Sequence, residues 1–191
     1  MNQICQNLSQ IEQICQDLLG QAEELANMDD RKPKQANLRR AVSSVYYALF
    51  HYMVQEACKA QLGTQHGTSQ YRRILARAFD HGSMKRACET FRGGNLPDHL
   101  CRSLPPAPHI SEQPIKNLAS TYFHLQGERH RADYDLTQPF HRSEVSYWIM
   151  AVRQAISDFH ELGKTSNAKQ QAERDFFLAC LWAWPRLNQR G

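Results

Sequence analysis

Apolar residues recur along this chain at intervals of three and four, which is the spacing of one face of an α-helix. The pattern near the N-terminus predicts a helix over about residues 2–27, which the charged run at 29–32 and Pro33 bring to an end. The apolar positions of this helix are Ile4, Leu8, Ile11, Cys15, Leu18, Ala22 and Leu25. We favour packing of this stripe against a core, with a dimer contact as the alternative.

The same spacing predicts the helices that follow. A second helix is expected over 35–61, with Gly63 as its stop. Its apolar stripe comprises Ala41, Val45, Ala48, Leu49, Tyr52, Met53 and Ala57. One or two shorter helices are expected over 68–92, interrupted at 81–83, and then an irregular stretch up to residue 108. Ser111 is predicted to cap the next helix, which ends near Asp135 because Pro139 follows. Ser143 is predicted to cap the helix after it, which Gly163 ends.

The C-terminal segment resembles a linker at 164–167 and is apolar on nearly all sides at 176–185. A helix of that kind cannot lie free on a surface, so we expect it to pack within the chain or in a dimer. Together the patterns predict an all-α fold. We expect an antiparallel helical bundle of five or six helices over residues 1–163 and a C-terminal helical appendage over 164–191.

Composition narrows the class of protein. The chain has 191 residues, of which 41% are hydrophobic and 22% charged, as is usual for a globular domain. No apolar run approaches the roughly 20 residues that span a bilayer, and the N-terminus lacks a secretory pattern. We therefore expect a cytoplasmic protein without a membrane partner. The six cysteines form no C-x-x-C pair, so we expect no metal site, and no phosphate-loop motif indicates a cofactor.

The net charge is only +4, but basic residues concentrate at 31–40 and 72–102. Such patches attract phosphate backbones, although most charge runs are solvated faces. The sequence shows no aromatic-plus-basic motif typical of a protein that binds single strands.

Chemically active side chains concentrate in one segment, residues 128–136. It contains Arg129, His130, Arg131, Asp133, Tyr134 and Asp135. On a helix, Arg129 lies four residues before Asp133 and Arg131 four before Asp135, which predicts two ion pairs. Such pairs contribute only about 0.2–0.5 kcal/mol each, so stability explains little of the clustering. A functional interpretation makes Arg129 and Arg131 phosphate-binding groups and His130 an acid or base. A solvated, self-paired helix end is the alternative.

The run Arg-His-Arg-Ala-Asp-Tyr-Asp at 129–135, the helical segment 40–51 and a closing helix after Ser143-Glu144 resemble the HEPN superfamily. The similarity is to its small stand-alone proteins with an Arg-x-x-Ala-Asp-Tyr signature, and it covers about residues 1–163. HEPN domains are helical bundles, usually homodimers. Many are metal-independent endoribonucleases or partners of nucleotidyltransferases in toxin–antitoxin and phage-defence systems. The resemblance thus implies a homodimer whose subunits form a basic cleft.

In a HEPN-like fold the helix over 35–61 lies near this segment, which adds His51 and Tyr47 to the candidates. We assign catalysis to Arg129, His130, Arg131 and His51, RNA binding to Arg129, Arg131, Tyr134 and Tyr47, and support to Asp133 and Asp135. Catalytic HEPN proteins carry an arginine, four to six residues and then a histidine, whereas here Asp133 stands in the place of the histidine. Two functions stay open. One is an RNA-acting protein, with metal-independent RNA cleavage as its candidate activity. The other is a non-catalytic helical dimer that binds a nucleotidyltransferase or nucleic acid.

Overall fold

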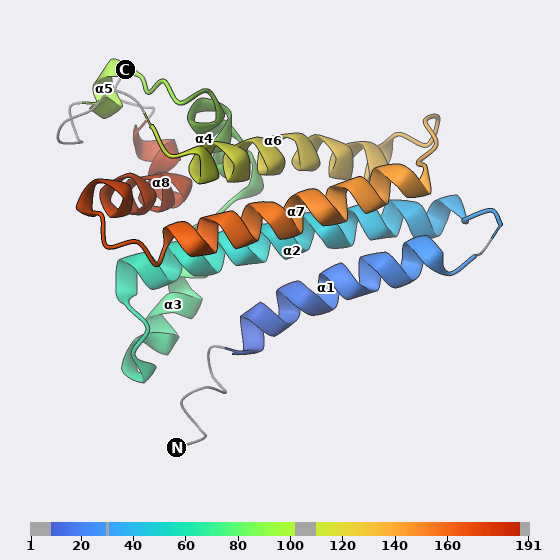
Figure 1. The fold of residues 1–191 in the computed structure, drawn as a ribbon, viewed down its shortest axis with the longest axis horizontal. Helices are drawn as coiled ribbons and strands as arrows, with labels where there is room; N and C mark the ends of the chain where they lie inside the picture. The colour runs from blue at the N-terminus through green and yellow to red at the C-terminus, as the bar shows by residue number, and fades with distance from the viewer. Residues whose placement is uncertain (1–8, 30, 102–109, 188–191) are drawn as a thin grey trace. The chain divides into compact units, whose positions relative to one another are not determined.

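The structure is a computed structural model that describes residues 9–29, 31–101 and 110–187. Over these ranges the protein is all-helical, as predicted, and contains no β-strand (Figure 1). The α-helices are α1 (Ser9–Asn27), α2 (Gln35–Leu62), α3 (Ser69–Leu75), α4 (His81–Gly93), α5 (Asp98–Cys101), α6 (Gln113–Tyr134), α7 (Arg142–Leu162) and α8 (Ala168–Leu187). Two short 3-10 helices, η1 (His66–Thr68) and η2 (Ala76–Ala78), flank α3. None of the helices in these ranges combines the length and apolar character that a bilayer crossing requires.

The bundle predicted over residues 1–163 had five or six helices, and the described part of that range contains seven α-helices, α1 to α7. The break between α3 and α4 falls at Phe79 and Asp80, not at 81–83, because the Asp80 carboxylate caps α4 by accepting from the Ser83 backbone N–H at 2.8 Å. In addition, α5 forms inside the stretch predicted to be irregular. The predicted start of the first helix and the whole region 102–108 lie outside the described residues.

The chain divides into two compact units. Unit 1 comprises Met1–Tyr52 and His124–Gln154, and unit 2 comprises Met53–Phe123 and Ala155–Gly191. The helices α2, α6 and α7 each contribute one part to either unit. The sequence-based boundary at residue 163 stays a prediction.

Within unit 1, neighbouring helices run in opposite directions. Between α1 and α2, the Cys15 thiol donates to the Ala48 carbonyl at 3.4 Å and the Ser44 hydroxyl donates to Gln21 at 2.9 Å, so rising numbers on α1 meet falling numbers on α2. The contacts of α2 with α6 follow the same order, from Arg39 with Arg131 to Tyr47 with Arg129. This antiparallel order brings the first half of α2 against the last turns of α6.

The predicted stripe of α1 agrees with the buried face at Cys15 and Ala22 and is one position off at its two leucines. Cys15, Leu19, Ala22 and Ala26 are buried, whereas the expected Leu18 and Leu25 are only half-buried. The predicted stripe followed a strict seven-residue repeat, but a straight helix has 3.6 residues per turn, so its contact face drifts about 20° per heptad. The predicted stripe on α2 is confirmed, because all seven of its members are buried. Gly63 ends α2 with a positive φ of 71°.

Within unit 2, α8 is part of the core. Its buried side chains are Glu173, Phe177, Leu178, Cys180, Leu181 and Trp184. The ring of Phe177 lies 5.0 Å from that of Phe91 on α4 and 5.9 Å from that of Phe159 on α7. The expectation that this apolar segment packs within the chain is therefore confirmed.

Two predicted helix caps are wrong. The Ser111 hydroxyl and backbone N–H donate to the buried Glu173 carboxylate, both at 2.8 Å, so Ser111 does not cap α6. Ser143 lies inside the first turn of α7, and the cap is made by Glu144, whose carboxylate accepts from the His141 backbone N–H at 2.7 Å. In both places a glutamate with two acceptor oxygens satisfies backbone donors that a serine was expected to satisfy.

Candidate functional site

The Arg129 side chain forms the centre of a polar network between α6 and α2. Its Nε lies 2.8 Å from an oxygen of Asp133, which confirms the first predicted ion pair. One terminal nitrogen donates to the Tyr47 hydroxyl at 3.2 Å, and the guanidinium lies 5.9 Å from the ring of Tyr46. The Ser43 hydroxyl donates to the other Asp133 oxygen at 2.9 Å. The network therefore fixes the Arg129 guanidinium against the first half of α2.

His51 extends this network along α2. It lies one turn after Tyr47, and the two rings stack with their centroids 6.2 Å apart. His51 is exposed, yet its surroundings remove part of the water from the imidazole and lower its pKa below the ordinary 6.5. The imidazole is consequently neutral at pH 7 and able to accept a proton. We call these three residues the His51–Tyr47–Arg129 row.

His130 and Tyr134 form a second pair on α6. Their ring centroids are 4.8 Å apart, and Tyr134 is 67% exposed. Because successive residues of a helix are about 100° apart, this pair occupies the face next to that of Arg129 and Asp133. In the structure, His130 contacts the ring of Tyr134. His51, in contrast, contacts Tyr47, and Tyr47 also contacts Arg129.

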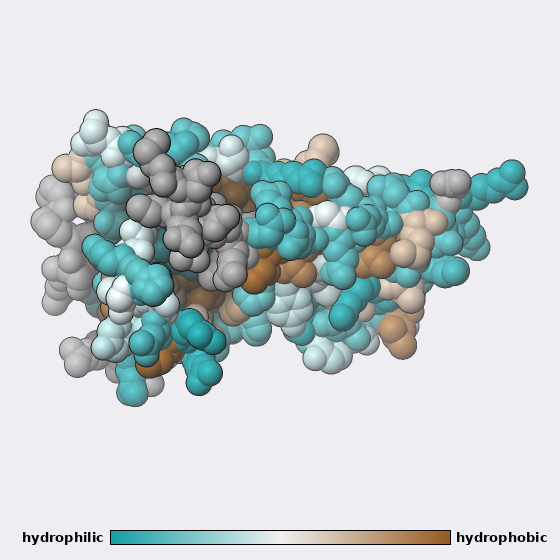
Figure 2. All heavy atoms as spheres, turned by 90° about the horizontal axis from the view of Figure 1, so that it is seen from below, coloured by the Kyte–Doolittle hydropathy of each residue, from teal (hydrophilic) through white to brown (hydrophobic). Residues whose placement is uncertain are grey.

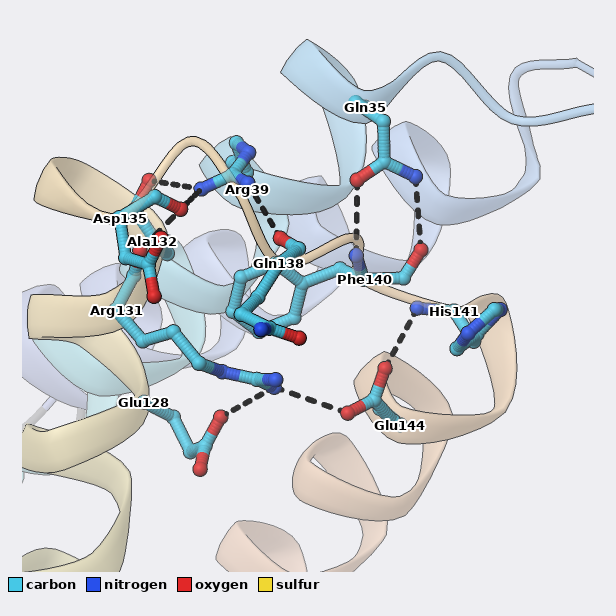
Figure 3. A network of polar contacts seen from close by, with 10 residues as sticks. All are labelled: Gln35, Arg39, Glu128, Arg131, Ala132, Asp135, Gln138, Phe140, His141 and Glu144. Carbon is cyan, nitrogen blue, oxygen red and sulfur yellow. Dashed lines mark hydrogen bonds and ion pairs between the residues drawn. The ribbon is translucent and has the colours of Figure 1, made fainter.

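Arg131 makes different contacts from those predicted. One terminal nitrogen lies 2.6 Å from Glu128 and 2.9 Å from Glu144 on α7, and the guanidinium lies 4.0 Å above the Phe140 ring (Figure 3). The predicted pair with Asp135 is wrong because α6 ends at Tyr134. The Asp135 carboxylate instead accepts from the backbone N–H and hydroxyl of Thr137, at 2.9 and 2.6 Å. Arg131 therefore links α6 to α7.

The charges of these groups stabilise one another. Burial acts to lower the pKa of Arg129, but Asp133 and Tyr47 outweigh it and the pKa is raised. Burial acts to raise the pKa of Glu144, but hydrogen bonds from Arg131 and the His141 N–H outweigh it and the pKa is lowered. Hydrogen bonds from Thr137 lower the pKa of Asp135. All of these groups are therefore charged at neutral pH.

Arg39, which sequence reasoning missed, holds the C-terminal end of α6. One of its nitrogens donates to the carbonyls of Arg131, Ala132 and Asp135 at 3.2, 3.0 and 2.8 Å, and the other to Gln138 at 2.6 Å (Figure 3). The last carbonyls of a helix have no partner within the helix, and a cation there also complements the helix dipole. From the sequence we can expect only that some hydrogen-bond donor satisfies the last carbonyls of α6. Arg39 could not be identified as that donor, because it lies more than ninety residues before them in the chain.

The loop after α6 is fixed by a second side chain of α2. The Gln35 amide donates to the Phe140 carbonyl at 2.9 Å and accepts from the Phe140 N–H at 2.8 Å (Figure 3). Phe140 itself is buried beneath Arg131. The last turn of α6, which carries the candidate residues, is therefore anchored on both α2 and α7.

Replacement of Arg39 by alanine is expected to lower the free energy of unfolding by about 2–3 kcal/mol, because four carbonyls lose a charged donor. The adjacent Arg40 is exposed, and the same change there is expected to cost less than about 0.5 kcal/mol. Urea unfolding followed by circular dichroism measures both. Equal losses for the two variants would contradict the role given to Arg39.

Over the described ranges, no group of three or more histidine, cysteine, aspartate or glutamate side chains is arranged to hold a metal ion. Cys15, Cys58, Cys88 and Cys180 are buried free thiols, and burial raises the pKa of Cys58 to about 11. These thiols serve as small core residues, not nucleophiles.

Comparison of the whole chain with family models, curated proteins and solved structures finds no match.

Proposed function

We propose that this protein acts on RNA as a HEPN-like, metal-independent endoribonuclease whose site is the His51–Tyr47–Arg129 row. The observation that carries the proposal is that a neutral histidine, His51, and a fixed arginine, Arg129, both contact Tyr47. In the sequence, no arginine in 128–136 is followed by a histidine at the spacing of catalytic HEPN proteins. Two helices distant in the chain supply the same pair of groups.

Each residue of the row has a chemical role in this proposal. The His51 imidazole accepts the proton of a ribose 2′-hydroxyl, whose oxygen attacks the adjacent phosphorus. The bond from phosphorus to the 5′-oxygen breaks, which leaves a 2′,3′-cyclic phosphate, and the departing oxygen takes a proton from water to become a 5′-hydroxyl. Arg129 stabilises the charge that develops on the phosphate, while Asp133 and Tyr47 hold its guanidinium in place.

The roles of the other candidates change in this proposal. Arg131, expected from the sequence to bind phosphate, is a positioning residue because Glu128 and Glu144 engage it. Asp135 likewise serves the turn after α6. His130 and Tyr134 form an exposed pair beside the row, suited to contact a base.

The HEPN resemblance also supplies the proposed setting. It implies a homodimer in which the corresponding α6 ends of two subunits face a shared cleft, with Arg129 lining it. It further implies a toxin–antitoxin or phage-defence system, in the cytoplasm, with a nucleotidyltransferase as the natural protein partner.

A second candidate function is binding without turnover, as a helical dimer that engages a nucleotidyltransferase or nucleic acid. The observation that favours it is that carboxylates already engage both guanidiniums, Arg129 by Asp133 and Arg131 by Glu128 and Glu144. A phosphate must therefore compete with a carboxylate for Arg129, which weakens its contribution to catalysis.

Incubation of the full chain with labelled single-stranded RNA in the presence of a metal chelator distinguishes the two. The proposed reaction yields fragments that end in a 2′,3′-cyclic phosphate and begin with a 5′-hydroxyl. RNA that is bound but left intact would favour the second candidate. RNA that is neither bound nor cleaved at low salt would overturn the proposal that the protein acts on RNA.

A further inference from the structure

The short helix α3 in unit 2 presents an exposed surface that the proposed function does not use. Tyr71 is 61% exposed and Ile74 is 66% exposed. Arg73 and Arg77 are exposed as well. In the described part of the chain these two arginines have no hydrogen-bond or ion-pair partner. Tyr71, Arg73 and Ile74 belong to α3 and Arg77 belongs to the adjoining 3-10 helix η2, and we call these four residues the α3 surface.

The opposite side of α3 is fixed to the rest of unit 2 by Arg72. Its guanidinium donates to the Gly63 and Gln65 carbonyls at 2.8 and 3.2 Å and to the Thr68 hydroxyl. The Cys58 thiol donates to the Arg72 carbonyl at 3.6 Å. Because Arg72 holds α3 against the preceding loop and the end of α2, the α3 surface is presented outward in a defined geometry.

The sequence on either side of this surface carries charge of one sign. No aspartate or glutamate occurs from residue 57 to residue 79, a stretch that contains Lys59, Arg72, Arg73 and Arg77. Lys59 pairs with Glu56 at 2.9 Å, and Arg72 is turned inward. Arg73 and Arg77 therefore provide the positive charge that is available to a partner, and such a partner must be an anion.

The side chains beside the two arginines narrow the class of anion. Arg73 and Arg77 are four residues apart on either side of the junction between α3 and η2, and guanidiniums bind phosphate through paired N–H groups. Tyr71 offers a ring on which a base can stack, and Ile74 adds apolar contact. A lipid surface suits this site less well, because binding to a membrane scales with the apolar area inserted and only two apolar side chains are exposed here.

We propose that the α3 surface is a binding site for single-stranded nucleic acid, in which Arg73 and Arg77 contact phosphates and Tyr71 stacks on a base. The site lies in unit 2 and requires no chemistry at His51, so it stands or falls independently of RNA cleavage. The sequence pattern alone did not indicate it, because Tyr71-Arg72-Arg73 reads as an ordinary charged helix until the structure turns Arg72 inward.

The test uses the full chain and a fluorescent single-stranded RNA of about 12 nucleotides, with single-stranded DNA of the same sequence in parallel. Fluorescence anisotropy is measured over a range of salt concentrations. The double variant Arg73→Glu, Arg77→Glu is expected to bind at least about tenfold more weakly, and its salt slope is expected to fall in magnitude by about 1.4, from the loss of two phosphate contacts. Tyr71→Ala is expected to weaken binding about fivefold or more with an unchanged salt slope.

The matched control is Lys164→Glu, Arg186→Glu, which changes the net charge equally on exposed residues of unit 2. An equal loss of affinity in this control would overturn the proposal, because net charge alone would then explain binding. Equal competition by polyglutamate would overturn it in favour of an acidic protein partner. Binding of the wild type to anionic phospholipid vesicles but not to the oligonucleotides would overturn it in favour of a membrane surface.

A parallel loss of affinity for RNA and DNA in the α3-surface variants supports a site that contacts phosphate and base. A loss of affinity for RNA alone adds recognition of the 2′-hydroxyl. Circular dichroism of each variant checks that it is folded.

Discussion

Replacement of His51 by alanine is expected to slow RNA cleavage by about a hundredfold or more, which is the usual contribution of a general base. His51 stacks on Tyr47, and Tyr47 contacts Arg129, so the imidazole and the guanidinium proposed to bind the phosphate contact the same tyrosine. The matched control is His160→Ala, because His160 is also exposed but lies on the part of α7 that belongs to unit 2. We expect that variant to retain cleavage within about fivefold. Comparable losses in both variants would contradict the assignment to His51.

The pH dependence of the same reaction follows from the lowered pKa of His51. Only the neutral imidazole accepts a proton, so the rate is expected to be independent of pH around 7. It should decline as the pH falls through the pKa of His51, below 6.5. A rate that still rises steeply between pH 7 and 8 would indicate a different base.

Replacement of Phe177 by alanine is expected to lower the free energy of unfolding by about 3–5 kcal/mol. The Phe177 ring is fully buried between Phe91 on α4 and Phe159 on α7, so its loss leaves a cavity that several helices line. The variant is expected to unfold at a clearly lower urea concentration than the wild type, as measured by circular dichroism and tryptophan fluorescence.

Trp182 on the same helix provides the control for Phe177. It is 37% exposed, and its replacement by alanine is expected to cost about 1 kcal/mol. If the Phe177 variant were as stable as the Trp182 variant, α8 would not belong to the core of unit 2. The apolar tail would then have to be explained by a partner.

The hydropathy of the exposed residues agrees with the division of side chains between a buried apolar core and a polar surface. The face shown in Figure 2 is mainly hydrophilic, with hydrophobic residues exposed in separate places. Large apolar side chains exposed in the described residues include Met28, Tyr134, Leu136, Tyr147 and Met150. Scattered residues of this kind are usual on a folded protein and do not by themselves indicate an interface.

Local periodicity predicted the helices well because most of their boundaries are set by nearby residues. The second helix was expected over 35–61 and is observed over Gln35–Leu62, with Gly63 in the left-handed conformation that ends it. On α1, Cys15 and Ala22 were predicted correctly, whereas Leu18 and Leu25 were predicted one position away from the buried Leu19 and Ala26. The sequence fixes the period of the stripe, but its rotation depends on the neighbour that covers it, here α2.

The candidate site shows the same division between local and distant interactions. The Arg129–Asp133 pair was predictable because its members lie one turn apart on one helix. The partners of Arg131 were not, because Glu144 belongs to the next helix and Asp135 leaves α6 for the turn. Arg39 was missed for the same reason, since any donor near the end of α6 satisfies those carbonyls equally well. The spacing of residues along the chain predicts contacts within one helix, whereas contacts between helices depend on how the helices pack.

Nuclear magnetic resonance of the protein labelled with ¹³C-histidine tests the central claim most directly, because it reports contact at the row whether or not RNA is cleaved. The His51 signal is assigned from its absence in the His51→Ala variant, and single-stranded RNA with a 2′-O-methyl group on each sugar is added to prevent turnover. If the row binds the RNA backbone, the His51 signal shifts as the RNA saturates the protein, while that of His160, exposed on the unit 2 part of α7, stays in place. A His51 signal that stays unchanged at saturating RNA would contradict the proposal that the His51–Tyr47–Arg129 row is the site at which this protein acts on RNA.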